Sequence, residues 1–562
     1  MKTRLAIAFA AGLLGVLAFP PFGWWPLAFV SVAGFTWAVH AQSARRGALI
    51  GLLFGAGLFL PMLHWTATYV GAVPWLVLVF SQTWYIALLG ACAPKLLARR
   101  WGPVWLAAGW VAEEALRDRF PFGGFPWGRW AFSQAESPMK WFATLGGAPL
   151  LTFMVTLGGT ILGTAFLGNG ERRIRERTGW LGSDLGQGAS RAVAAALIPV
   201  IGLLLWIPLH PRAAPRTTTV AAVQGDVPDR GLEFDARRRQ VLDNHVAQTM
   251  KLAAEIKAGT VAKPELVLWP ENASDIDPTD NLDAAQEIQQ AVDAVGVPIL
   301  VGALLDGPGA THVTNAGILW EPSGSSQPGP GERYVKRHPV PFGEYIPLRS
   351  VARAVSKKVD LVGRDMIAGT GNGLMTQTPY PIGDVICFEV AYDSLVRSSV
   401  KAGAQMLVVQ TNNATFGHSA ETYQQLAMSQ LRAVENGRSV VQVATSGKSA
   451  IIDADGTKLD ESGALFTPDI LVQTIGLRTS TTLATRVGAI PEWLLTAFAL
   501  FGVLAGLMPW MRRRTARSRT KGNDTKRNDA KRNDTERKNE RELTAPVPNE
   551  PSPQPAIEKR NG

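Results

Sequence analysis

Three side chains that could do chemistry together stand in order along the chain, each closing a short strand-like segment. Glu271 supplies a carboxylate, Lys336 an ammonium and Cys387 a thiol. A thiol attacks only after it loses its proton, and the oxyanion formed by the attack needs a positive or hydrogen-bonding partner. The set therefore predicts a covalent catalyst in which a nucleophile has its own base and its own oxyanion partner.

The chain holds only two cysteines, which argues against a disulfide framework and against a cysteine-ligated metal site. None of the seven histidines has the spacing of metal ligands, so we expect neither a metal nor another cofactor. A lone cysteine at a strand end is more often a small core residue than a nucleophile, but the carboxylate and ammonium upstream favour catalysis for Cys387. Cys92 lies in an apolar run, and we expect it to be inert.

The composition is that of a membrane protein. Hydrophobic residues make up 46% of the 562 residues and charged residues only 18%, which is low for a soluble protein. Many of the 18 tryptophans stand near the ends of apolar runs, as expected at the level of lipid headgroups. The net charge of +10 would suggest a nucleic-acid partner in a soluble protein. Here the basic residues flank apolar runs or lie in the C-terminal tail, so we expect a lipid bilayer as the partner and no nucleic acid.

Eight apolar runs approach the roughly 20 residues that a membrane-spanning helix needs. They are Leu5–Phe19, Trp24–Val39, Gly47–Thr66, Pro74–Leu97, Trp101–Ala112, Phe142–Leu167, Ala192–Leu209 and Pro491–Trp510. The first run could instead be a cleaved signal peptide. However, Pro20 and Pro21 stand in place of a small-residue cleavage site and further runs follow at once, which favours a retained span.

Basic residues predict which side of the membrane each connection faces. Every second connection is basic: Lys2 and Arg4, Arg45 and Arg46, Lys95 with Arg99 and Arg100, the arginines of 172–177, and Arg512, Arg513 and Arg514. Because such connections stay in the cytoplasm, both termini are expected there and the block 212–486 outside. The short run Trp101–Ala112 could be a half-buried helix that never crosses, but the arginines of 172–177 would then fall outside, which favours a crossing.

These patterns predict four parts. A seven-span membrane domain occupies 1–211, an extracytoplasmic catalytic domain 212–486, the eighth span 487–514, and a disordered basic cytoplasmic tail 515–562. Within the first part, the connection Phe120–Gly128 is rich in proline, glycine and aromatic residues. It could rest on the membrane interface near a point of lipid entry, or it could simply pack between helices.

The block after residue 211 has the pattern of an α/β domain. Short β-branched runs predict strands at Thr219–Val223, Leu266–Trp269, Val297–Gly302, Val313–Leu319, Val385–Cys387, Met406–Gln410, Val440–Ala444 and Ala450–Ile452. Helical patterns between them cover Ala236–Lys257, Ala284–Val295, Ala391–Ala402 and Tyr423–Asn436. The alternation implies helices packed on sheets, with Glu271 and Cys387 at or just after strand ends, where such folds place their chemistry. We expect Arg432, Glu435 and Arg438 on a solvated helix face.

Three motifs in this block carry a resemblance to a known family. They are Trp269-Pro270-Glu271-Asn272, the run Tyr334–Tyr345 that contains Lys336 and Glu344, and Ile386-Cys387-Phe388-Glu389. In this order they resemble the carbon–nitrogen hydrolase, or nitrilase, superfamily, which uses a Glu-Lys-Cys triad on an αββα sandwich. Seven spans before the domain and one after it resemble the membrane-embedded apolipoprotein N-acyltransferases of that superfamily.

The resemblance implies a role for each matched residue. Glu271 takes the position of the general base, Lys336 that of the oxyanion stabiliser and Cys387 that of the nucleophile. Three further residues take supporting positions: Glu344, Phe388 and Glu389. The sequence departs from the family pattern at Asn412–Gly417, where a run like Asn-Asp-Ala-Trp-Phe-Gly is expected, and at Ser446-Gly447, where Asn-Gly is expected. Both segments lie outside the triad, so the departures concern pocket shape and substrate preference.

The implied fold is an α-helical polytopic membrane domain, with about eight transmembrane helices, plus an extracytoplasmic nitrilase-like αββα sandwich. The implied reaction is phospholipid-dependent N-acylation of the N-terminal diacylglyceryl-cysteine of apolipoproteins, the last step of lipoprotein maturation, through a thioester on Cys387 and without a cofactor. The partners would be a phospholipid acyl donor and an apolipoprotein acceptor at the bacterial cytoplasmic membrane.

Two alternatives to this reaction remain open. One is a membrane-anchored amide or nitrile hydrolase with the same triad, although seven spans are excessive for an anchor. The other is a transporter or scaffold with a degenerate domain. The apolar runs lack the paired internal charges and the inverted repeat that transport would favour.

Overall fold

The computed structural model describes residues 1–167, 184–227 and 238–506, together with a few isolated positions in the tail. Three predictions therefore fall outside the described residues, wholly or almost wholly. They are the arginine cluster at 172–177, the basic residues 512–514 and the disorder of 515–562. The chain divides into the units Met1–Gly502 and Val503–Gly562. The fold and the site that follow belong to the first unit.

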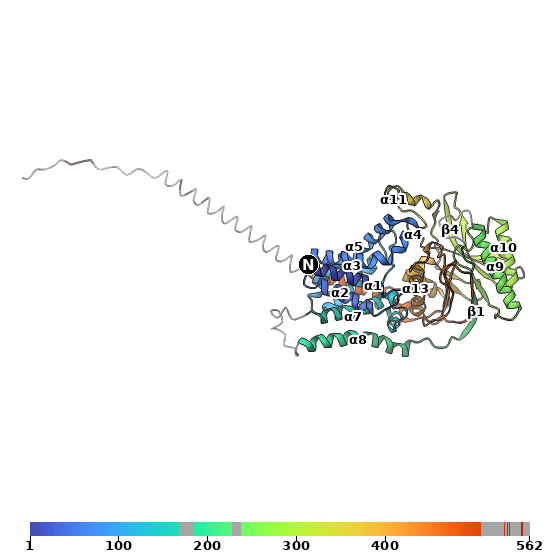
Figure 1. The fold of residues 1–562 in the computed structure, drawn as a ribbon, viewed down its shortest axis with the longest axis horizontal. Coiled ribbons are helices and arrows are strands. Elements are labelled where there is room, and N and C mark those ends of the chain that lie inside the picture. The colour runs from blue at the N-terminus through green and yellow to red at the C-terminus, as the bar shows by residue number, and fades with distance from the viewer. Residues whose placement is uncertain are drawn as a thin grey trace, which may run out of the picture. The chain divides into compact units, whose positions relative to one another are not determined.

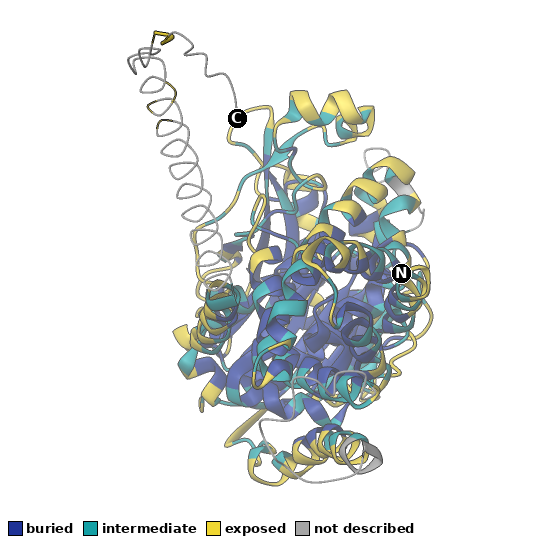
Figure 2. Cartoon of the chain, turned by 90° about the vertical axis from the view of Figure 1, so that its left-hand side faces the viewer, coloured by how far each residue is buried: buried dark blue, intermediate teal, exposed yellow. Residues whose placement is uncertain are grey.

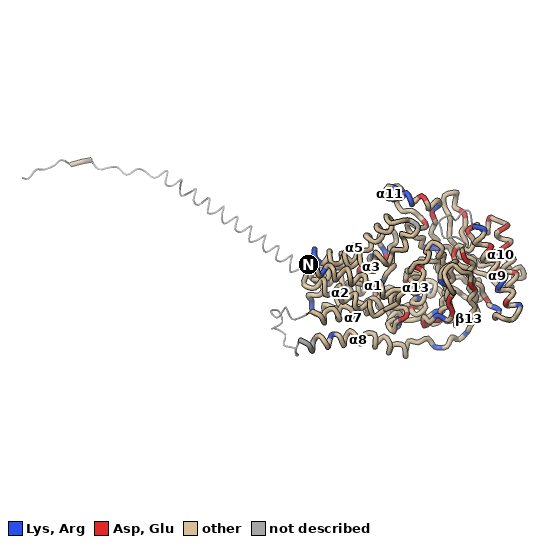
Figure 3. The backbone as a smooth tube through the Cα atoms, in the orientation of Figure 1, with Lys and Arg blue, Asp and Glu red and all other residues tan. Residues whose placement is uncertain are grey.

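A helix occupies each of the eight predicted apolar runs (Figure 1). In chain order these are α1 (Lys2–Val16), α2 (Leu27–Val39), α3 (Ala44–Met62), α5 (Ala72–Leu97), α6 (Gly102–Arg117), α7 (Phe142–Ala165), α8 (Asp184–Leu209) and the helix Ile490–Gly506. Short helices connect them: η1 (His64–Thr66), α4 (Ala67–Val70), η2 (Trp130–Gln134) and η3 (Pro138–Trp141). Lysine, arginine and acidic positions are few along α2, α3 and α7 (Figure 3).

Four helical segments among the described residues are both long and apolar enough to cross a membrane. They are Ala44–Met62, Ala72–Leu97, Pro138–Ala165 and Gly188–Leu209, while Leu27–Val39 and Ile490–Gly506 are apolar but shorter. Length and composition thus identify fewer spans than the eight predicted. One reason is visible in α6, whose last turns carry Glu113, Glu114 and Arg117 in buried positions.

Small residues let these helices approach one another closely. A Cβ added to Gly12 of α1 would lie 2.1 Å from the carbonyl oxygen of Phe54 in α3, and one added to Gly47 would lie 2.1 Å from that of Gly90 in α5. Ser31 of α2 donates a hydrogen bond of 2.7 Å to a carbonyl of α1. Such contacts are typical of helices that associate within a bilayer, and they make α1 part of the bundle, as a retained first span requires.

The following domain contains two β-sheets. The first has the order β13 (Asp469–Leu477), β1 (Arg216–Gln224), β2 (Leu266–Leu268), β3 (Ile299–Asp306), β4 (His312–Glu321) and β5 (Gly329–Val335), with β6 (Asp365–Met366) beside β4. The second has the order β12 (Lys458–Glu461), β11 (Ala450–Ile452), β10 (Val440–Ala444), β9 (Met406–Thr411), β8 (Ile382–Ile386) and β7 (Leu374–Met375). All eight predicted strands are present.

The helices of this domain cover the outer faces of the two sheets. Helices α9 (Arg238–Lys257) and α10 (Leu282–Val295) pack on the first sheet, and α12 (Asp393–Ala402) and α13 (Glu421–Asn436) on the second. The remaining helices are α11 (Arg349–Val355), η4 (Lys357–Leu361), η5 (Cys387–Ala391), η6 (Ala414–Phe416) and α14 (Leu483–Val487). The four helices predicted in this block are thus present.

Two apolar clusters hold the layers together, and buried residues fill the sheets between the more exposed helix faces (Figure 2). One cluster joins the two sheets, with Val220 of β1 and Val408 of β9 both fully buried. The other joins the first sheet to its helices, with Leu242 of α9 and Ile288 of α10 fully buried. The domain is therefore layered as helix, sheet, sheet and helix. The three predicted site residues follow β2, β5 and β8.

Candidate active site

Cys387 stands on a sharp turn between a strand and a helix. Strand β8 ends at Ile386, and η5 begins at Cys387 itself. The backbone φ of Cys387 is 55°, in the left-handed region, where a residue with a side chain costs on the order of 1–3 kcal/mol. The backbone N–H of Ile386 donates to Glu389 Oε2 at 2.9 Å, which fixes the turn. Such a turn presents a nucleophile beyond the end of its sheet.

Glu271, 3% exposed, is held at both carboxylate oxygens. Its Oε1 accepts from Lys336 Nζ at 2.9 Å and from Asn315 Nδ2 at 2.6 Å. Its Oε2 accepts from the backbone N–H of Asn412 at 2.8 Å. Burial without such donors would be costly for a carboxylate. These bonds therefore fix one orientation of Glu271.

Lys336 lies directly after β5, is 1% exposed and bridges two carboxylates, those of Glu271 and Glu344. Glu344 Oε2 in turn accepts from the backbone N–H of Val340 at 2.9 Å. Burial opposes the charge on Lys336, but the carboxylates of Glu271 and Glu344 outweigh it and raise the pKa of Lys336 well above its ordinary value. An ammonium has three donors, so two carboxylate bonds leave one N–H for an oxyanion.

The Cys387 sulfur accepts weak hydrogen bonds from Thr411 Oγ1 at 3.4 Å and from Gln425 Nε2 at 3.7 Å. Burial and the negative charge of Glu271 raise the pKa of the thiol well above its ordinary value, and Lys336 offsets only part of that rise. These two influences favour the protonated form of the resting thiol. Lys336 does favour the thiolate, as a fixed positive charge should, but its contribution is the smaller one.

Glu389 is fully buried and ties the end of β5 to the turn at Cys387. Besides the N–H of Ile386, its carboxylate accepts from the hydroxyl of Tyr334 at 3.0 Å and from the backbone N–H groups of Arg337 at 2.7 Å and His338 at 3.1 Å. These contacts are those of a residue that positions the segments bearing Lys336 and Cys387. They leave little of the carboxylate free for chemistry.

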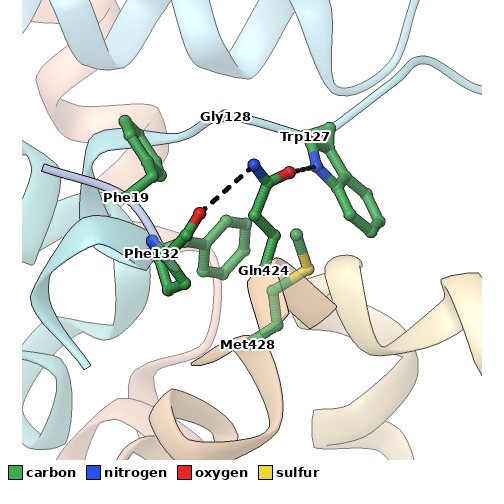
Figure 4. Close-up of a pocket in the computed structure, with 7 residues that line it drawn as sticks. Phe19, Trp127, Gly128, Phe132, Gln424 and Met428 are labelled. Atoms are coloured by element: carbon green, nitrogen blue, oxygen red, sulfur yellow. Dashed lines mark hydrogen bonds between the residues drawn. The ribbon is translucent and has the colours of Figure 1, made fainter. Parts of the chain in front are cut away.

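Phe388 joins the site to the connection Phe120–Gly128. Its ring stacks on Trp127, with centroids 5.8 Å apart and planes at 5°, and on Phe125 at 5.7 Å. Trp127 Nε1 also donates to Gln424 Oε1 of α13 at 2.6 Å (Figure 4).

The packing interpretation of this connection is confirmed for its second half, and the interpretation as a membrane-interface segment stays a prediction. The second half packs between the helices and the catalytic domain. Phe120 and Phe122, in the first half, remain exposed.

The predicted solvated face of α13 is wrong. Arg432, Glu435 and Arg438 are all buried. Arg432 pairs with Glu435 and, at 2.7 Å, with Asp393 of α12, and Arg438 donates to backbone carbonyls, including that of Ala404 at 2.7 Å. Charged residues spaced by three along a helix look the same whether solvent or other charges face them, so the sequence pattern alone was misleading.

Several residues that hold the reactive groups were missed from the sequence. They are Asn315, Thr411 and Gln425. Asn315 interrupts the apolar run Val313–Leu319, and a polar residue in a buried strand is a usable signal, since it must find a partner. Thr411 and Gln425 carry no such signal, because threonine and glutamine are ordinary at a strand end and in a helix.

Comparisons with known proteins match both parts of the chain. Residues 11–161 match the family model described as apolipoprotein N-acyltransferase N-terminal domain, and residues 219–484 match that of carbon-nitrogen hydrolase. The chain is 38% identical over 521 residues to an apolipoprotein N-acyltransferase of Mycolicibacterium smegmatis, which covers 90% of this chain and 85% of that protein. It is 30% identical over 473 residues to one of Pseudomonas putida, covering 80% and 86%.

Among solved structures, an amidase of the nitrilase superfamily from Nesterenkonia AN1 matches with 16% identity and a TM-score of 0.35. It covers 49% of this chain and 95% of that one. The extent and identity of the match to the curated relatives decide the assignment. The chain belongs to the apolipoprotein N-acyltransferase family.

Proposed function

We propose that the protein moves a fatty acyl chain from a phospholipid to the N-terminal amine of a diacylglyceryl-modified cysteine on an apolipoprotein. Membership of the family makes the chain an acyltransferase and gives the class of reaction. The observation that carries the mechanism is the buried meeting of Glu271, Lys336 and Cys387 at the ends of three strands. The chemistry needs no cofactor.

In the first half-reaction, Glu271 takes the proton of the Cys387 thiol as the sulfur attacks the ester carbonyl of the phospholipid. The third N–H of Lys336 stabilises the tetrahedral oxyanion, and such a donor is worth about 3 kcal/mol. The C–O bond then breaks, and Glu271 passes its proton to the departing lysophospholipid oxygen. A thioester remains on Cys387, and burial of the sulfur keeps water from hydrolysing it.

In the second half-reaction, the amine of the acceptor attacks the thioester carbonyl. Glu271 takes a proton from the attacking nitrogen, and Lys336 again faces the oxyanion. The C–S bond breaks, and the proton on Glu271 returns to the sulfur. The products are an amide and a free thiol, so the cycle is ping-pong and leaves the triad as it began.

We further propose that all eight helices cross the bacterial cytoplasmic membrane, with both termini in the cytoplasm and the catalytic domain outside. The basic connections in the sequence support this placement. A cysteine introduced at the exposed Thr260 should react with an impermeant thiol reagent added to intact spheroplasts. Protection until lysis would place the domain in the cytoplasm and would rule out the proposed substrates.

The acyl-enzyme itself gives the decisive test. Incubation with a phospholipid labelled in its acyl chain should attach label to the protein, and hydroxylamine should release it. Cys387→Ala should take up no label, whereas Cys92→Ala should label like the parent. An absence of label combined with hydrolysis of small amides would instead indicate a membrane-anchored hydrolase using the same triad.

A further inference from the structure

Two fully buried polar side chains, neither of them in the triad, donate hydrogen bonds to the sulfur of Cys387. Strand β9 runs parallel to β8 and ends at Thr411, whose hydroxyl reaches Sγ at 3.4 Å. Gln425 lies in the second turn of α13, and its Nε2 reaches Sγ at 3.7 Å. Burying a hydroxyl or an amide is costly unless it is hydrogen-bonded. Contacts built at this cost point to a role in the chemistry of the sulfur.

The orientation of the Gln425 amide is fixed at its oxygen. Oε1 accepts a hydrogen bond from Asn413 Nδ2 at 3.1 Å, and the hydroxyl of Thr411 lies 3.0 Å from it. Asn413 is itself buried, so solvent does not compete for the amide. Since an amide oxygen accepts and an amide nitrogen donates, these neighbours select the orientation in which Nε2 faces the sulfur.

The hydroxyl of Thr411 has one hydrogen and two acceptors within reach, Gln425 Oε1 and Cys387 Sγ. A neutral thiol is a weak acceptor, so the amide oxygen takes this hydrogen while the sulfur is protonated. Hydrogen bonds to a charged acceptor are about twice as strong as neutral ones. The hydroxyl therefore turns to the sulfur when a thiolate forms, and Asn413 keeps Gln425 Oε1 satisfied after the turn.

The thiolate needs such donors because its surroundings otherwise disfavour it. Burial and Glu271 raise the pKa of the Cys387 thiol, while Lys336 and the hydrogen bond from Thr411 lower it. The sulfur becomes negative twice in the proposed cycle. It does so when Glu271 takes the thiol proton, and again when the C–S bond breaks and its electron pair goes to the sulfur. Lys336 donates to the oxyanion at both points, which leaves the charge on the sulfur to other donors.

We propose that Thr411 and Gln425 are catalytic residues that stabilise the thiolate of Cys387 in both half-reactions, and that Asn413 is a positioning residue that acts through Gln425. This inference rests on the proposed acyl transfer, in which Cys387 is the nucleophile. The two donors bind the thiolate more strongly than they bind the thiol or the thioester. A contact raises a rate only when it strengthens in this way as the reaction proceeds.

The test measures the alkylation rate of Cys387 in the full-length protein in detergent, in a Cys92→Ala background that leaves one thiol. Thr411→Val removes the hydroxyl and keeps the shape of the side chain, whereas Thr411→Ser keeps the hydroxyl. Gln425→Leu removes the amide. Each variant is alkylated with iodoacetamide and with the bulkier N-phenyliodoacetamide, both of which are neutral.

Matched controls come from the same domain. Thr378 is buried and donates to the backbone carbonyl of Tyr380, and Gln430 is buried in α13 and donates to that of Gly456. Thr378→Val and Gln430→Leu therefore repeat the two substitutions without touching the sulfur, and both should be alkylated at the parent rate.

A rise of about one unit in the pKa of a thiol lowers its thiolate fraction about tenfold, and the more basic thiolate recovers about threefold through its greater nucleophilicity. We therefore expect Thr411→Val and Gln425→Leu to be alkylated roughly three- to tenfold more slowly than the parent, by the same factor with both reagents, and Thr411→Ser to react at about the parent rate. Parent rates for Thr411→Val and Gln425→Leu would overturn the inference. A loss that differs between the two reagents would also overturn it, because it would report access to the sulfur.

Two further measurements address the cycle and Asn413. The acyl-enzymes of Thr411→Val and Gln425→Leu should transfer their acyl group to a diacylated lipopeptide more slowly than the parent, because their thiolate is the poorer leaving group. Asn413→Ala should slow alkylation in the parent but not in Gln425→Leu, and equal slowing in both would overturn its positioning role. Failure of the unmodified protein to form any acyl-enzyme would overturn the proposed function, whereas the alkylation rates would still decide what stabilises the thiolate.

Discussion

Two buried charge clusters adjoin the turn at Cys387, and they differ in their balance of charge. In the triad cluster (Glu271, Lys336 and Glu344), one ammonium lies between two carboxylates. In the bridging cluster (Arg129, Asp393, Arg432 and Glu435), one carboxylate lies between two guanidinium groups, since Asp393 pairs with Arg129 at 2.8 Å and with Arg432 at 2.7 Å.

The triad cluster therefore has one carboxylate more than it has cations, whereas Asp393 and Glu435 match the two guanidinium groups of the bridging cluster. The surplus carboxylate of the triad cluster helps burial to hold the Cys387 thiol protonated. In the bridging cluster, burial opposes the charge on Asp393, but Arg129 and Arg432 outweigh it and hold its pKa below the ordinary value. The first cluster thus contains Glu271, which gives and takes protons in the proposed mechanism, and the second contains a carboxylate whose charge is held by its guanidinium partners.

The bridging cluster also connects the membrane helices to the catalytic turn. Arg129 follows α6, while Asp393 begins α12 directly after η5. A Cβ added to Gly147, where α7 kinks, would lie 2.7 Å from Glu435 Oε1, so the kink brings α7 against this cluster. The comparison predicts that substitutions in the triad cluster change rates, whereas those in the bridging cluster change stability.

The largest effect is expected for Lys336→Met. The substitution removes the oxyanion donor, so the single-turnover rate of acyl-enzyme formation should fall by roughly 10²- to 10³-fold. Lys448→Met, at a lysine that pairs with Glu461 outside the site, should keep the parent rate. A rate for Lys336→Met close to that of the parent would remove Lys336 from the mechanism.

Asp393→Ala should act on stability instead. It leaves Arg129 and Arg432 buried without the acceptor they share, and breaking a buried pair in this way costs about 3–5 kcal/mol. Thermal unfolding in detergent should show the loss, and Asp283→Ala, at an exposed pair, should show little. If Asp393→Ala unfolded like the parent but lost acyl transfer, the bridging cluster would belong to the chemistry.

The pH dependence of thiol alkylation tests whether the pKa of Cys387 is raised, as its place beside the triad cluster predicts. A raised pKa means that the thiolate fraction is small at neutral pH and grows about tenfold with each pH unit. Alkylation of Cys387 by a neutral haloacetamide should therefore keep rising from about pH 6 to about pH 9 without a plateau. Lys336→Met should slow it at every pH, because Lys336 lowers the pKa of the thiol. A plateau below about pH 8 would show a thiolate at rest.

The sequence indicated most strands and the three residues of the proposed triad, because both depend on local patterns. Glu271, Lys336 and Cys387 stand in short motifs, and a strand such as Met406–Thr411 begins with four consecutive apolar residues, a pattern typical of a buried strand. Strand β13 was missed. It pairs antiparallel with β1 along all nine residues of each strand, so its place is set by a partner more than 200 residues away.

The burial of charged residues could not be predicted from local sequence patterns. Arg432 and Glu435 have the spacing of a surface ion pair, and only the approach of Asp393 and Arg129 from other segments shows that they are internal. Burial of charge is a property of the assembled layers, which no single segment encodes.

The smallest predicted effect concerns the aromatic stack that joins the two regions. Trp127 comes from the membrane part and Phe388 from the turn after Cys387, and their rings are nearly parallel. Stacked aromatic pairs are worth about 0.5–1.5 kcal/mol beyond the area they bury. In a double-mutant cycle of Trp127→Leu and Phe388→Leu, the unfolding free energy in detergent should therefore show a coupling of about 1 kcal/mol.

The same cycle with Trp65 in place of Phe388 gives a matched control. Trp65 lies 5.6 Å from Trp127 but is tilted by 58°, and both residues belong to the membrane part. Coupling in that pair would report packing within the helices alone. If Trp127 and Phe388 showed no coupling while Trp127 and Trp65 did, the stack of Trp127 on Phe388 would contribute nothing measurable to the free energy of unfolding. The attachment between the membrane helices and the turn at Cys387 would then depend on other contacts, such as the bridging cluster and the hydrogen bond of 3.0 Å from Tyr392 to the carbonyl of Gly124.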